Sequence, residues 1–151
     1  MKLIYLISIF SLSNNLFSQE VISIADSEKK YSKDSLQEHY FYRIMSDEIT
    51  ECFEVSPELF LSEWSKFTRE VGKYLKDNNF LFGKQTKGLV DVYFNKNGTI
   101  DYFFISLRDD TVSKEKFDKM LSLLKEFSKG YKFTISAKQA FSNSGGINFM
   151  H

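Results

Sequence analysis

The chain has 151 residues, a length that fits one domain, and 42% hydrophobic with 26% charged residues is a globular rather than a disordered composition. Its 20 lysine and arginine residues balance 20 aspartate and glutamate residues, so the chain lacks the basic excess that is typical of proteins that bind nucleic acid. One cysteine excludes an internal disulfide framework, and one proline excludes a proline-rich spacer.

Residues 1–18 have the pattern of a secretory signal peptide. Lys2 precedes an apolar run at residues 3–12, which is shorter than the about 20 residues that a membrane span needs. The segment Phe17-Ser18-Gln19 resembles the signal ends of some Gram-negative bacteria. We expect cleavage after Ser18, with cleavage after Ser13 or an uncleaved anchor as alternatives. The prediction is an exported protein, periplasmic or secreted, whose mature form has no membrane attachment.

The first part of the mature chain is predicted to be a leader followed by a helix. Residues 19–34 are polar and read as an exposed leader, in which residues 21–24 could form a short strand. Across residues 35–49, apolar side chains recur at spacings of three and four, which predicts an amphipathic helix. Its apolar stripe consists of Leu36, Tyr40, Phe41, Ile44 and Met45.

A second, stronger helix is predicted from residue 57 to about residue 78. Ser56 is a good capping residue, Pro57 suits the first helical position, and Glu58 adds an acidic side chain to the first turn. The apolar stripe then follows the helical period to residue 75. Residues 83–88 are predicted to be a loop.

Two strands with a tight turn follow. Val90, Val92 and Phe94 alternate with more polar residues up to residue 95, and Asn97-Gly98 marks a hairpin with Gly98 in the left-handed conformation. The apolar match predicts three cross-strand pairs, Phe94 with Ile100, Val92 with Tyr102 and Val90 with Phe104. The other face is also apolar, so we expect cover on both faces of the sheet.

The remaining elements are predicted as a helix and two further strands. Asp109-Asp110-Thr111 caps a helix that ends at Gly130, with a stripe that includes Leu121 and Leu124. Residues 131–135 alternate as a third strand, residues 137–146 form a polar loop, and residues 147–149 form a short last strand. The predicted fold is a single α+β domain over residues 35–151, with an antiparallel sheet packed on helices. The predicted core includes Phe67, Val92, Phe94, Leu121 and Leu124.

The chemistry-bearing residues indicate no enzyme, metal site or cofactor. Cys52 paired with His39 or His151 would lack a third orienting group, so we expect Cys52 to be buried and inert, or free for an intermolecular bridge. The adjacent Asp109 and Asp110 fit helix capping better than acid–base catalysis. Asp91 and Asp101, on the paired strands, are expected to be solvated or at the sheet edge.

Residues 89–149 resemble the C-terminal domain of TonB-type energy transducers. Residues 90–100, VDVYFNKNGTI, match the family's opening strand and turn; residues 113–127 stand where the family helix stands, and Gly146-Ile147-Asn148-Phe149 matches the closing strand. The helix from residue 57 to 78 matches the helix before the sheet, which extends the TonB-like part to about residues 57–150. The resemblance implies a small α+β domain that binds another protein by strand addition.

The partner-binding residues expected on this basis are Ser144, Ile147, Asn148 and Phe149, because a short terminal strand leaves backbone groups free for pairing. The partner is expected to be another protein or a second copy of the chain. The alternative is a small-ligand-binding protein or an enzyme, with a pocket between the N-terminal helices and the sheet near Trp64 and Tyr74.

Overall fold

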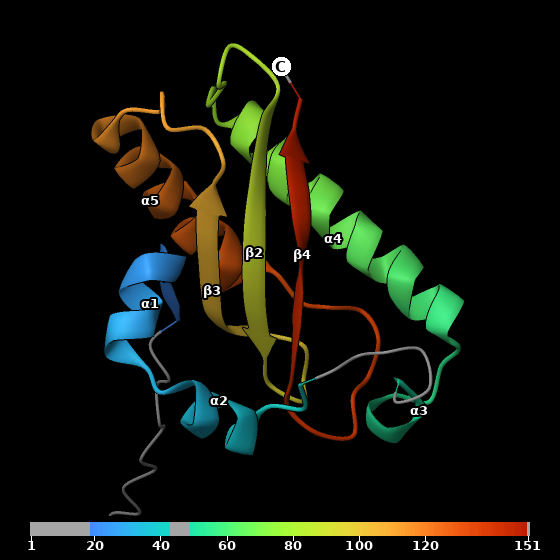
Figure 1. The fold of residues 1–151 in the computed structure, drawn as a ribbon. Coiled ribbons are helices and arrows are strands. Elements are labelled where there is room, and N and C mark those ends of the chain that lie inside the picture. Colours follow the sequence, from blue (N-terminus) through green and yellow to red (C-terminus); the bar gives the residue numbers. More distant parts are fainter. Residues whose placement is uncertain (1–18, 43–48, 151) are drawn as a thin grey trace, which may run out of the picture.

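The computed structural model describes residues 19–42 and 49–150 and has an α+β fold (Figure 1). The elements in chain order are β1 (Glu20–Ser23), α1 (Ile24–Lys30), α2 (Lys33–His39), α3 (Ile49–Cys52), α4 (Pro57–Asp77), β2 (Thr86–Phe94), β3 (Ile100–Leu107), α5 (Lys114–Gly130) and β4 (Phe141–Phe149). The predicted signal peptide, residues 1–18, lies outside the described residues, as do Ile44, Met45 and His151.

The four strands form one mixed sheet in the order β1-β3-β2-β4. β2 is antiparallel to β3 and to β4, whereas β1 is parallel to β3, so the sheet is not purely antiparallel as predicted. Helices α4 and α5 pack on one face, and α1 and α2 lie against the other (Figure 1). β1 and β4 are therefore the two edge strands, with helices on both faces between them.

Residues 20–30 form β1 and α1 instead of the predicted exposed leader. Val21 is buried against the sheet, and Ser27 of α1 is buried as well. The Ser23 hydroxyl caps α1 by accepting a hydrogen bond from the Asp26 backbone N–H at 3.0 Å. The short strand considered at residues 21–24 is found one residue earlier, at Glu20–Ser23. It pairs with β3 about 80 residues away, and local periodicity cannot indicate that pairing.

Residues 43–48 of the helix predicted over residues 35–49 lie outside the described residues, and before them the prediction is wrong beyond His39. α2 ends there, and Tyr40 is extended, with φ −121° and ψ 129°. Phe41 then forms a parallel bridge with Phe141 at the start of β4. Tyr40 and Phe41 have the spacing of a helical stripe but lie in a short extended segment, because pairing with β4 overrides the local helical period.

Helix α4 begins as predicted. The Ser56 hydroxyl accepts a hydrogen bond from the Leu59 N–H at 3.3 Å, and Pro57 occupies the first turn. Phe67, at the middle of the helix, packs against Phe94 and Phe103 of the sheet at ring-centroid distances of 5.7 and 5.9 Å. The long helix thereby supplies the centre of the hydrophobic core.

The hairpin is confirmed at its turn but not along its whole register. Gly98 has φ +85°, and Phe94 pairs with Ile100 as predicted. A bulge follows at Asp101, so the register shifts by one residue, and the remaining pairs are Val92 with Phe103 and Val90 with Ile105. This extra residue exchanges the faces of β3. Phe103 and Ile105 therefore join the core instead of the opposite face.

Four features of the C-terminal half differ from the prediction. α5 is capped by Ser113, while Asp109 instead accepts a hydrogen bond from the Thr111 N–H at 3.0 Å in the preceding turn. Residues 131–135 form no strand; they contribute one isolated bridge, between Lys132 and Thr99. Residues 141–146, predicted as part of a polar loop, belong to β4, which is nine residues long instead of short. β2 likewise begins inside the predicted loop 83–88.

The predicted core is confirmed except at one position. Four of the five residues are fully buried, and these are Phe67, Val92, Phe94 and Leu124. Leu121 is only half-buried and packs at the border of the core. Its place beside the true stripe of α5 explains this, because Met120, Leu124 and Phe127 take the central positions.

Candidate functional site

The outer edge of β4 is the first candidate site. On its inner side β4 pairs with β2 along its whole length. On its outer side, Phe41 donates its N–H to Ala140 O at 2.8 Å and accepts the Ser142 N–H at 3.0 Å. Both backbone groups of one residue in an antiparallel pair point to the same side, and the side alternates along the strand. The outward groups beyond Ser142 are therefore those of Ser144, Gly146 and Asn148.

These outward groups have no strand partner among residues 19–42 and 49–150. We call the backbone N–H and C=O groups of Ser144, Gly146 and Asn148 the open edge. All three residues are exposed, and their side chains are small or absent, so nothing bulky on β4 itself blocks an approaching strand. Such an edge is a template for pairing with another chain.

The side chains of the predicted partner residues divide into two groups. Ser144 and Asn148 are exposed on the face of the sheet that carries α1 and α2. Ile147 and Phe149 are only 2% and 3% exposed and belong to the core, where the Phe149 ring packs 5.1 Å from that of Phe82. Ile147 and Phe149 hold the strand in place, and a partner can reach only their neighbours.

Helix α4 lies beside the open edge. Figure 1 shows this helix crossing behind β2 and β4, with its N-terminal part extending beyond β4. The contact is close, because a Cβ atom built on Gly145 would lie 2.9 Å from Trp64 Nε1. Tyr74 packs against Phe127 of α5, so that side of α4 faces α5. Leu61 projects on the opposite side of the helix and is 58% exposed. This side of α4, which faces away from α5, therefore carries an exposed apolar side chain.

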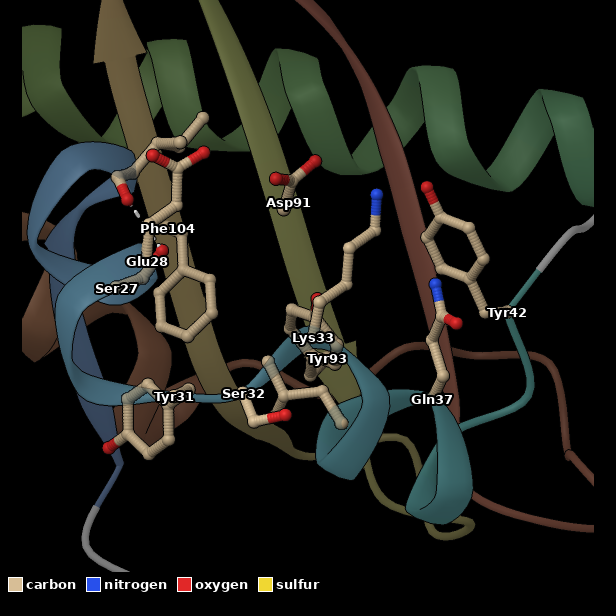
Figure 2. Close-up of a pocket in the computed structure, with 12 residues that line it drawn as sticks. Ser27, Glu28, Tyr31, Ser32, Lys33, Gln37, Tyr42, Asp91, Tyr93 and Phe104 are labelled. Atoms are coloured by element: carbon tan, nitrogen blue, oxygen red, sulfur yellow. Dashed lines mark hydrogen bonds between the residues drawn. The ribbon is translucent and has the colours of Figure 1, made fainter.

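A hollow on the other face of the sheet is the second candidate site. It has a volume of about 400 Å³ and lies between α1, α2 and strands β2 and β3 (Figure 2). This hollow is not at the place expected for a pocket, near Trp64 and Tyr74, since neither residue lines it. Those two side chains pack in the layer between α4, α5 and the sheet, against Phe67 and Phe127.

The remaining candidate residues form no catalytic arrangement among the described residues. Cys52 is a free, buried thiol, and burial raises its pKa to about 11, so it is protonated at neutral pH. His39 is exposed on α2, and its Nδ1 lies 2.8 Å from Ser35 O. Asp109 forms an ion pair with Lys84 at 2.8 Å, and the hydrogen bond from Lys84 lowers its pKa to about 2. Within residues 19–42 and 49–150, no cluster of His, Cys, Asp or Glu has the arrangement of a metal site.

Asp101 has a role that the sequence did not indicate. Its carboxylate accepts a hydrogen bond from Tyr40 Oη at 3.0 Å, so it is a half-buried structural group and not a solvated one. Asp91 is half-buried in the wall of the hollow. The bulge that turns Asp101 inward depends on strand pairing, which the alternation of the sequence cannot show.

Comparisons with protein-family models, with curated proteins and with solved structures found no significant match to this chain. In the part of the chain that the structure describes, none of the helices is both long and apolar enough to cross a membrane.

Proposed function

We propose that this protein is an exported, non-enzymatic domain that binds an extended segment of another protein by strand addition at the open edge. The observation that carries the proposal is the row of outward backbone groups at Ser144, Gly146 and Asn148, which lack a strand partner among the described residues. A peptide that pairs with them gains main-chain hydrogen bonds, and its alternate side chains can be read by the surfaces on either face.

The surroundings of the open edge favour an added strand of limited length. Phe41 occupies the outer side of β4 at Phe141, so pairing is available only beyond Ser142. One set of alternate side chains on the added strand would face α4 near Leu61. The other set would lie beside Gly146. Gly146 pairs with Leu89 of β2, whose side chain is 39% exposed. Apolar side chains on the partner would therefore gain contact on both faces.

Two features of the sequence support this function further. The order α4, β2, β3, α5, β4 is the order expected from the resemblance to the TonB C-terminal domain, a class of domain that binds another protein. The signal-peptide pattern of residues 1–18 favours a partner in the periplasm or outside the cell.

The proposal is tested with a peptide library displayed on phage and selected on the purified protein. The affinity of synthetic copies of the selected peptides is then measured by calorimetry for wild type, Asn148→Pro and Asn148→Ala. Proline removes the outward N–H, whereas alanine keeps it and removes only the side chain. Circular dichroism checks that each variant is folded.

We expect the selected peptides to bind Asn148→Pro at least about tenfold more weakly than wild type, since a main-chain hydrogen bond and strand geometry are lost. Asn148→Ala should bind within about twofold of wild type. Ser144→Pro, paired with Ser144→Ala, repeats the comparison at the other end of the open edge. Peptides that bind both folded proline variants as tightly as wild type, or a selection that yields no binder, would rule out the open edge as the binding site.

A further inference from the structure

The hollow on the α1 and α2 side of the sheet has an aromatic floor. Phe104 of β3 stands at its centre, with the Tyr93 ring 5.4 Å and the Tyr31 ring 5.8 Å from it by centroid distance. Phe104 and Tyr93 are nearly fully buried, so their positions are fixed by packing. Figure 2 shows Phe104 and Tyr31 beside α1, with Tyr93 behind Lys33. The floor is therefore a rigid set of ring faces and edges.

Charged side chains stand around this floor. Asp91 comes from β2, Glu28 from α1 and Lys33 from the start of α2 (Figure 2). Among the described residues, none of these three groups forms an ion pair within 4.0 Å, although seven other pairs are found in the same part of the chain. The Lys33 ammonium lies 6.0 Å from the centroid of the Tyr42 ring at the rim. The described part of the walls thus carries two carboxylates against one ammonium.

We propose that this hollow binds a small organic monocation with a flat or apolar body, such as an aromatic amine or amidine. The apolar body would lie on the floor of Phe104, Tyr93 and Tyr31, where the ring faces also attract a cation. The cationic head would bind Asp91, with Glu28 across the hollow adding to the attraction by a charge-assisted hydrogen bond or at longer range. A volume of about 400 Å³ is within the usual size of small-molecule sites.

The positive charge of Lys33 should oppose the binding of a cation in this hollow. Among the lining residues that the structure describes, the Lys33 ammonium is the one cationic group, and it competes with a bound cation for the same carboxylates. Removal of its charge should therefore strengthen binding, whereas removal of the Asp91 charge should weaken it. The site is separate from strand addition, because the ligand would contact side chains on a face of the sheet, and strand addition uses the backbone edge of β4.

The probe is benzamidine, a flat aromatic monocation, and the matched control ligand is benzamide, its neutral near-isostere. Each is titrated into the isotopically labelled protein, and amide shifts in two-dimensional NMR spectra locate the site and give the Kd. The variants are Asp91→Asn, Glu28→Gln and Lys33→Gln. The control variant is Asp77→Asn, which makes the same change in net charge at the end of α4, a helix on the opposite face of the sheet.

We expect benzamidine to shift the amides of Asp91, Tyr93 and Phe104 and to bind at least about tenfold more tightly than benzamide, since a charge-assisted hydrogen bond is worth that much. Asp91→Asn should weaken benzamidine by roughly tenfold and Lys33→Gln should strengthen it, while Asp77→Asn leaves it within about twofold. Equal affinity for the two ligands, unchanged affinity in Asp91→Asn, or shifts confined to other parts of the protein would each overturn the proposal.

Discussion

Tyr40 Oη donates a hydrogen bond to Asp101 Oδ2 at 3.0 Å, and this bond joins the end of α2 to the bulge of β3. The two residues are 61 positions apart in the chain. Both groups are partly buried, and burial raises the pKa of each. The bond therefore ties the N-terminal segment to the hairpin through a carboxylate whose charge costs free energy to bury.

The first prediction concerns the pH dependence of stability. Burial raises the pKa of Asp101 above its usual 3.8, although hydrogen bonds from Tyr40 and Asn95 partly offset the effect. The folded state therefore binds the proton more tightly than the unfolded state, and stability is lost as pH rises from 3.8 through the raised folded pKa. Urea unfolding of wild type and Asp101→Asn should show a difference that grows in favour of the variant across this range. The test is how this stability difference changes with pH, because the hydrogen bonds lost in the variant shift the difference by the same amount at every pH. A difference that moves the other way would mean that the hydrogen bonds outweigh burial.

The hairpin that contains Asp101 has one feature that the sequence predicts and one that it does not. Asn97-Gly98 identifies the turn, because Gly98 needs a positive φ, and this part of the prediction is confirmed. The bulge at Asp101 is a different kind of feature, since it depends on how β3 meets β2 and on the bond from Tyr40. Apolar residues at both parities of β3 allow either register, so alternation could not choose between them.

The second prediction separates two leucines of α5. Leu124 is fully buried, so Leu124→Ala should lower the free energy of unfolding by about 2–5 kcal/mol through lost burial and a cavity. Leu121 is half-buried at the border of the core, and Leu121→Ala should cost clearly less. Chemical denaturation of both variants measures the difference. Equal losses, or a larger loss at Leu121, would show that the stripe of α5 is placed wrongly.

The third prediction compares the two adjacent glycines of β4. A Cβ atom at Gly145 would lie 2.9 Å from Trp64 Nε1, and Trp64 is itself packed against Phe67, so Gly145→Ala should cost about 1–3 kcal/mol. A Cβ atom at Gly146 would meet nothing within 4 Å, so Gly146→Ala should change stability by no more than about 0.5 kcal/mol. Thermal and urea unfolding of the pair provide the measurement. A Gly145→Ala variant as stable as wild type would contradict the close packing of α4 on β4.

The expected site was located only in part from the sequence. The closing strand was expected from Ile147 and Phe149, and both lie in β4, but they are core residues. The polar and glycine-rich residues before them read as a loop because they carry little β propensity. Their place in the strand comes from full pairing with β2, and their small side chains are what leave the edge accessible. The hollow also depends on α1, which is not visible as a periodic pattern.

The most direct test of the open edge is amide hydrogen exchange along β4, measured residue by residue by NMR. The account predicts an alternation. The inward amides of Asn143, Gly145, Ile147 and Phe149 should exchange slowly because they bond to β2. Ser142 should also be protected through its bond to Phe41, whereas Ser144, Gly146 and Asn148 should exchange fast. A bound peptide should then protect these last three amides. Uniform slow exchange through all of β4 in the free protein would mean that the edge is already covered, and would contradict binding by strand addition.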